Sequence, residues 1–104
     1  MERNLVLGKI KETVMAEYND AKVVLFGSRA RGTESKESDW DILILLNKQT
    51  VSLKDEQSIR HKIYDIELET EQSISTFVFP INDWNTKLSV TPLFANVLKE
   101  GIYL

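Results

Sequence analysis

The sequence predicts an α+β fold, a mixture of α and β elements built around a small sheet. Three segments carry apolar residues at helical spacing, and three short apolar runs that lie among them are typical of strands. The 104 residues suffice for one domain, residues 1–104, with a modest core. The expected order is helix, strand, helical turn, strand, helix, strand and helix.

The first half of the chain is expected to hold a helix, a strand and a turn. The helix covers residues 4–18, because one stripe of it is apolar: Leu7, Ile10, Val14 and Tyr18. The run KVVLF, residues 22–26, predicts a short buried strand that Gly27 and Ser28 end. SRARG then begins a helical turn that stops at Gly32.

The middle of the chain predicts a strand followed by a long helix. DWDILILL, residues 39–46, follows a polar loop and is expected to be the second strand. A helix over residues 52–70 is indicated by the spacing of Ser52 and Asp55, which resembles a capping box. Its inner face is apolar: Ile59, Ile63 and Ile66.

The last third of the chain predicts a strand and a final helix. SISTFVF, residues 73–79, is expected to be the third strand and to end at Pro80, and a short turn is expected at Asp83-Trp84. Thr91-Pro92 begins the helix, because proline suits the first helical position, and Gly101 ends it. Three residues give this helix its expected inner face: Leu93, Val97 and Leu98.

Composition excludes several classes of site. The chain has no cysteine and one histidine, so disulfides, thiol catalysis and sites that need two histidines are excluded. The formal charge of −3 argues against nucleic acid as a direct partner. No segment is long and apolar enough to span a membrane, and the first four residues do not resemble a signal peptide. We therefore expect no membrane partner and a cytoplasmic location.

Two acidic residues at the start of the second strand are the leading candidates for catalysis. Side chains alternate across a strand, so Asp39 and Asp41 point the same way and Trp40 points to the other face. Two neighbouring carboxylates repel each other unless a cation lies between them. Oxygen ligands suit Mg²⁺ or Mn²⁺, which also bind phosphate oxygens. Asp39 and Asp41 are therefore the expected metal ligands.

The bend after the first strand is the expected phosphate-binding part of the site. Gly27 lets backbone N–H groups approach an anion, and the Ser28 hydroxyl adds a hydrogen bond. Arg29 and Arg31 bring positive charge. Each feature alone is more often a turn or a solvated surface group. The order of strand, Gly-Ser, basic turn, polar loop and Asp-x-Asp strand favours a joint nucleotide site.

The blocks FGSRARG and SDWDILI resemble the signature of the DNA polymerase β-like nucleotidyltransferase superfamily. They are most similar to its minimal nucleotidyltransferases, the antitoxin-like members often paired with HEPN-domain proteins. The resemblance implies a small mixed sheet with helices packed on one side. It also implies transfer of a nucleoside monophosphate, AMP from ATP, to a hydroxyl group, plausibly on a partner protein.

The resemblance implies a role for each candidate residue. Gly27 and Ser28 would hold the β- and γ-phosphates, with Arg29 and Arg31 as further phosphate contacts, and Asp39 and Asp41 would bind the divalent metal. Two alternatives stay open. One is a weak or inactive nucleotide-binding antitoxin that neutralises a HEPN-type toxin by binding. The other is a structural adaptor whose carboxylates bind no metal.

The chain departs from the family pattern at the third carboxylate, which the next strand of the site usually supplies. Alternation places that position at Ser75, which is no acid. Glu67, Glu69 and Glu71 come shortly before it, and Glu71 is the nearest substitute. A site with two carboxylates still binds a metal-bound nucleotide, but a poorly placed attacking oxygen would slow the reaction.

Overall fold

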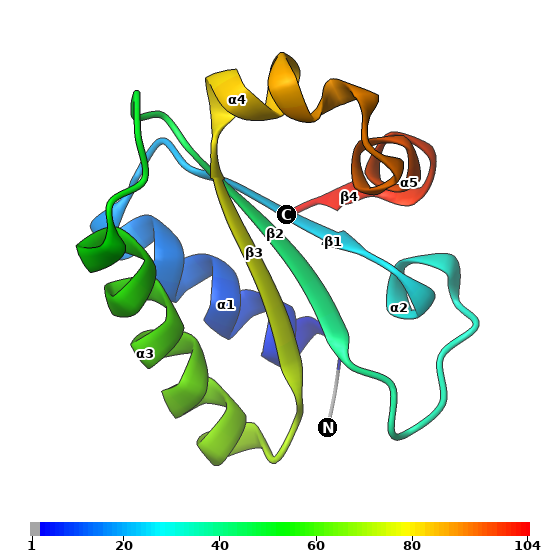
Figure 1. Ribbon diagram of the computed structural model, residues 1–104. Helices are drawn as coiled ribbons and strands as arrows, with labels where there is room; N and C mark the ends of the chain where they lie inside the picture. The colour runs from blue at the N-terminus through cyan, green and yellow to red at the C-terminus, as the bar shows by residue number, and fades with distance from the viewer. Residues whose placement is uncertain (1–2) are drawn as a thin grey trace.

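The computed structural model describes residues 3–104 of the chain; residues 1 and 2, where the segment tested for a signal peptide begins, lie outside it. The described elements alternate between helix and strand as far as β3, and helical segments then follow one another up to the last strand (Figure 1). They are α1 (Arg3–Glu17), β1 (Lys22–Phe26), α2 (Ser28–Arg31), β2 (Trp40–Leu46), α3 (Leu53–Thr70), β3 (Ile74–Pro80), α4 (Ile81–Asn85), the 3-10 helix η1 (Lys87–Val90), α5 (Pro92–Glu100) and β4 (Ile102–Tyr103).

The predicted helices are confirmed, and their ends are set by the expected side chains. The Ser52 hydroxyl accepts from the Asp55 N–H, and the Asp55 carboxylate accepts from the Ser52 N–H, which completes the capping box of α3. Thr91 caps α5 by accepting from the Phe94 N–H, and Gly101 ends that helix. Neither η1 nor the two-residue strand β4 was predicted from the sequence.

The sheet has four strands in the order β3-β2-β1-β4. β1 is antiparallel to β2 and β4, whereas β2 and β3 are parallel. Parallel neighbours need a long crossover, and α3 supplies it. The register places Asp41 beside Phe26 on one side and Ser75 on the other.

The larger core lies between one face of the sheet and the helices α1 and α3, which run side by side across it (Figure 1). Alternate strand residues face this layer, including Ile42 and Ile44, because side chains alternate along a strand. Ile59 and Ile63 on α3 meet them as the sequence predicted. This face fixes the strands that carry the candidate site.

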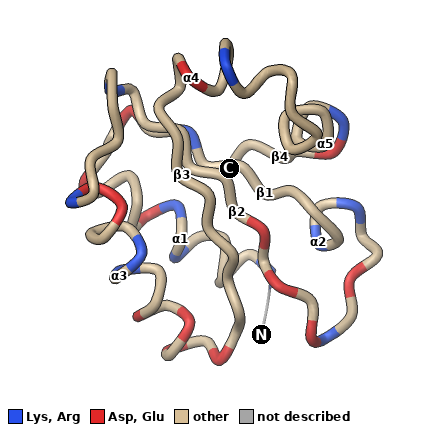
Figure 2. Tube along the Cα trace, in the orientation of Figure 1, with Lys and Arg blue, Asp and Glu red and all other residues tan. Residues whose placement is uncertain are grey.

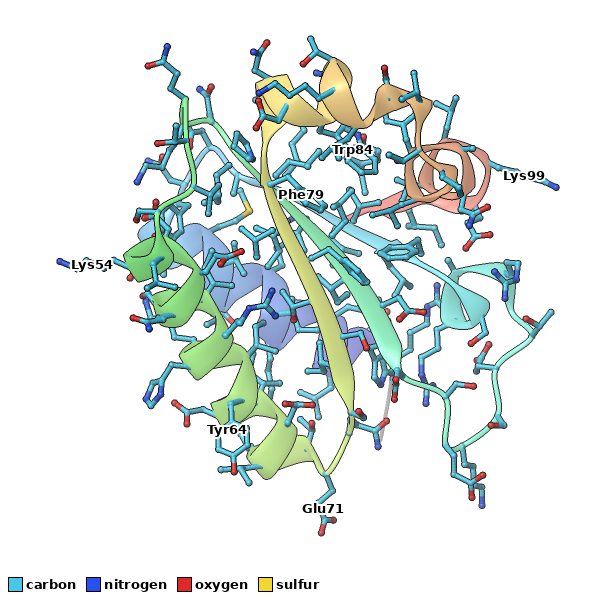
Figure 3. All side chains as sticks on the ribbon, viewed as in Figure 1. Lys54, Tyr64, Glu71, Phe79, Trp84 and Lys99 are labelled. Carbon is cyan, nitrogen blue, oxygen red and sulfur yellow. The ribbon has the colours of Figure 1, made fainter. Side chains whose placement is uncertain are left out.

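The other face of the sheet is covered at one end by the short C-terminal helices. The prediction of helices packed on one side of the sheet is correct for α1 and α3. It did not include the C-terminal helices, which form a second layer on the other face, against β1 and β2. Trp84 is its centre: its ring stacks on Phe79 at 6.2 Å between centroids (Figure 3). Leu98, predicted to face inward, is 78% exposed, because Val97 takes the buried position of α5.

No helix within residues 3–104 combines the length and apolar composition that crossing a membrane requires.

Candidate active site

Asp41 and Gly27 meet where β1 ends and β2 begins. Gly27 has φ +78°, and a Cβ atom built on it would overlap the Asp41 carboxylate. Only glycine adopts this backbone conformation readily and leaves that room. The structure therefore brings together two residues that the sequence predicted for one site.

Asp39 lies one residue before β2 and is exposed to solvent. Its carboxylate accepts a hydrogen bond from the Ser75 hydroxyl at 3.4 Å. Asp41 faces the same side of the sheet as Leu43, so alternation places both aspartates on the face opposite α1 and α3. The rings of Phe26 and Phe77 lie next to them on that face, 5.7 Å apart between centroids.

The electrostatics of Asp41 are those of a carboxylate without a partner. Within residues 3–104, no side chain donates a hydrogen bond to Asp41, and neither aspartate takes part in an ion pair. Burial raises the pKa of Asp41, and so does the negative charge of Asp39, while Arg31 opposes the shift. A cation beside the pair would relieve this repulsion.

The two carboxylates fit an oxygen-ligated divalent cation that keeps waters and phosphate oxygens as its other ligands. Among the described residues no group of three or more acidic, histidine or cysteine side chains is placed to hold a metal by itself. Asp39 and Asp41 therefore fit a metal ion whose remaining ligands come from a bound nucleotide and water. Asp39 is exposed and Asp41 half-buried, so the pair lies at the surface. A hollow of about 190 Å³ lies elsewhere and is lined in part by Trp84, Phe94 and Tyr103.

Arg29 lies away from the aspartates, beneath the loop that leads to them. Its guanidinium is buried and stacks on the Trp40 ring at 4.2 Å from the centroid. Its Nε donates to the Ser38 carbonyl at 3.0 Å. Because Trp40 points to the α1 face, the structure does not bring Arg29 together with Asp41. Its guanidinium instead holds the loop that positions Asp39.

Arg31 lies on the exposed side of α2 and pairs with a residue that sequence reasoning missed, Glu100. Its Nη1 lies 3.0 Å from Glu100 Oε1. The Gly27 N–H donates to the other Glu100 oxygen at 2.5 Å. Figure 2 shows acidic positions at the start of β2 and the end of α5, with basic positions on α2. A carboxylate at a helix C-terminus is electrostatically disfavoured, and this unusual position was the feature of the sequence that could have drawn attention to Glu100.

The acidic residues before β3 do not supply a third carboxylate. Glu71 ends α3 at φ 57° and points away from the sheet (Figure 3). Glu67 accepts from the Ile74 N–H at 2.8 Å and so holds the start of β3. Ser75, predicted as the position of the missing acid, does lie beside Asp41 in the register.

A family model described as nucleotidyltransferase domain matches residues 7–102. Two solved structures share the fold. A crystal structure of a toxin–antitoxin with AMP-PNP gives a TM-score of 0.63 at 17% identity, over 92% of this chain and 69% of that one. A crystal structure of the toxin–antitoxin MntA-HpeT with two aspartate-to-glutamate substitutions gives a TM-score of 0.62 at 14% identity, over 99% of this chain and 72% of that one. No curated protein matches this chain in sequence.

Proposed function

This chain belongs to the nucleotidyltransferase domain family, and we propose that residues 1–104 form one such domain that transfers AMP from ATP to a hydroxyl group on a partner protein. In this reaction the hydroxyl oxygen attacks the α-phosphorus and forms a new O–P bond. The bond to the bridging oxygen of the β-phosphate breaks, pyrophosphate leaves, and the hydroxyl proton passes to solvent water.

One observation carries the proposal: the Asp41 carboxylate lies against the Gly27 bend with no hydrogen-bond donor of its own among the described residues. A buried or half-buried carboxylate that serves the fold is normally paired. Asp41 is kept beside Asp39 instead, at a cost seen in its raised pKa. Such an arrangement favours binding of a cation.

The chain's residues divide the work of binding. Asp39 and Asp41 would hold Mg²⁺ or Mn²⁺, and nucleotidyltransferases use divalent metals. When bound, the metal neutralises phosphate charge and stabilises the attacking and leaving oxygens. Ser28 opens α2, so its N–H has no partner within that helix and is available to phosphate. The Gly27 N–H and the Arg31 guanidinium, which contact Glu100 in this structure, would be the further phosphate contacts. Arg29 positions the loop before Asp39.

A partner protein suits the open surface of this site. Asp39 is exposed and Asp41 half-buried, so an acceptor hydroxyl carried on another protein can reach them. The similar solved structures are toxin–antitoxin complexes, one with AMP-PNP. Together with the motif resemblance, they support a HEPN-domain toxin as the partner and ATP as the nucleotide.

A second function is favoured by Ser75. Its hydroxyl stands beside Asp41, where the family resemblance leads us to expect a third carboxylate. Loss of that group slows a reaction that depends on placing the attacking oxygen. The alternative function is a nucleotide-binding antitoxin that neutralises a HEPN-type toxin by binding alone.

Incubation with α-³²P-labelled ATP, Mg²⁺ and the HEPN-domain partner tests the transfer. We expect label on the partner, and we expect Asp41→Asn to reduce the rate at least about 100-fold. Asp65→Asn, which changes an exposed carboxylate on α3, is the matched control and should transfer at the wild-type rate. ATP binding without label on the partner would favour the binding-only antitoxin, and absence of both would refute the nucleotide site.

A further inference from the structure

Glu100 is the last residue of α5, and its carboxylate occupies donors that the proposed nucleotide site needs. The side chain is only 13% exposed. Its Oε2 accepts from the Gly27 N–H at 2.5 Å, and its two oxygens lie 3.0 Å and 3.1 Å from Arg31 Nη1. A backbone N–H and a guanidinium are the groups that bind phosphate in proteins.

The surroundings of Glu100 disfavour a negative charge except for these two contacts. The C-terminus of a helix carries partial negative charge, so an acid there is electrostatically unfavourable. Glu100 also adds to the negative field that raises the pKa of Asp41. Gly27 and Arg31 therefore hold the carboxylate in place against the rest of its environment. This contact shows directly that the bend accepts an anion.

We propose that Glu100 is a built-in competitor of the nucleotide: its carboxylate occupies the anion site formed by Gly27 and Arg31, and the polyphosphate of ATP binds by displacing it. This inference rests on the proposed nucleotidyltransferase function and identifies a residue that sets the affinity of the site. Glu100 is released toward solvent when phosphate oxygens take over its two contacts.

The backbone makes this displacement feasible. Glu100 is followed by Gly101, whose N–H bonds to the Val97 carbonyl at 2.7 Å, so α5 keeps its end when the side chain moves. Arg31 is half exposed and can follow a new anion without loss of packing.

Glu100→Gln tests the competition, with inorganic tripolyphosphate and Mg²⁺ as the probe. The amide keeps the size of the side chain and removes its charge, so the probe should bind the variant about 10-fold more tightly than wild type by calorimetry. Glu17→Gln is the matched control, since Glu17 likewise accepts from two groups, the Ser58 hydroxyl and the Lys62 ammonium, but on the α1–α3 layer. Its affinity should equal that of wild type.

A measurement on the unchanged protein keeps the test independent of how the variant folds. In carbon-detected NMR of wild type, the side-chain carboxyl resonance of Glu100 should move to the position of a solvated glutamate as the probe saturates the site. An unmoved resonance at saturation would overturn the inference.

The remaining outcomes separate the two proposals. If wild type binds the probe but Glu100→Gln binds equally or more weakly, Glu100 is no competitor, and the proposed function stands. If neither protein binds the probe and no label is transferred from ATP, the proposed function and this inference both fall.

Discussion

Two carboxylates in this molecule have opposite environments. Asp55 on α3 is buried and accepts from three groups: Lys48 at 2.7 Å, Tyr18 at 2.7 Å and the Ser52 N–H at 3.0 Å. Hydrogen bonds, above all that from Lys48, lower the pKa of Asp55. Asp41 has no such donor among the described residues, and burial raises its pKa.

The difference separates a group that holds the fold from a group kept for binding. Paired acids such as Asp55 stabilise the native state, because every ionised oxygen keeps a partner after folding. An unpaired acid such as Asp41 lowers stability, and it persists where a ligand supplies the missing partner. For Asp41 and Asp55, the absence or presence of a hydrogen-bond donor therefore separates the two roles, whereas both side chains are at least half-buried.

The largest effect is expected when each of the two carboxylates is replaced by an amide and the losses of stability are compared. Asp55→Asn should lower the free energy of unfolding by about 2–4 kcal/mol, since Lys48 and Tyr18 lose a charged partner. Asp41→Asn should change it by less than about 0.5 kcal/mol or raise it, while transfer of label is lost. Urea unfolding of the two variants measures both. Equal destabilisation by the two substitutions would contradict the comparison.

Two glycines with the same φ of +78° sharpen the comparison at the level of the backbone. Gly27→Ala should destabilise by about 2–3 kcal/mol, because the new Cβ adds an overlap with Asp41 to the backbone strain. Gly32→Ala is its control: a Cβ there meets nothing within 4 Å, so only about 1 kcal/mol is expected. Thermal unfolding ranks the two, and only Gly27→Ala should abolish nucleotide binding.

Lowering the pH should change the contributions of Asp55 and Asp41 to folding stability in opposite directions. The lowered pKa of Asp55 means that its stabilising contribution is complete above the unfolded-state pKa and is lost as pH falls. The raised pKa of Asp41 acts in the opposite direction, because the folded state takes up a proton more readily than the unfolded one. Over the range from about pH 6 to about pH 2, stability should fall more steeply than wild type in Asp41→Asn above about pH 4, because the folded-state pKa of Asp41 lies above its unfolded value, and less steeply in Asp55→Asn below about pH 4, where the unfolded carboxyl takes up its proton.

Urea unfolding at several pH values in that range would show these slopes. Identical slopes for the two variants would mean that neither carboxylate differs between the folded and unfolded states as its contacts indicate.

Local patterns predicted most of the fold. The capping pair Ser52 and Asp55, the Thr91-Pro92 start and the alternation along β2 each depend on residues near one another in sequence, so they could be inferred without coordinates. The second helical layer and β4 could not, because they depend on contacts between the C-terminal segment and β1.

The site residues also divide into those that local sequence predicted and those that depend on distant contacts. Gly27, Asp39 and Asp41 were predicted from a compact motif, and the structure places Gly27 against Asp41. The neighbours of Arg29 were not predictable, since its stacking on Trp40 follows from how the loop between them folds back. Glu100 lies 73 residues from Gly27 in the chain, and no local pattern connects them.

The smallest expected effect concerns the position beside Asp41 where an acid is missing. Ser75→Asp places a third carboxylate near Asp39 and Asp41, so without metal it should lower the unfolding temperature by a few degrees, about 1 kcal/mol. Mg²⁺ should restore that loss, because the cation then has three oxygen ligands on one face. Thr76→Asp, one residue further on the opposite face, should not respond to Mg²⁺. A Mg²⁺ response equal in the two variants would mean that β3 does not face the metal site, and the family geometry would then not apply to this chain.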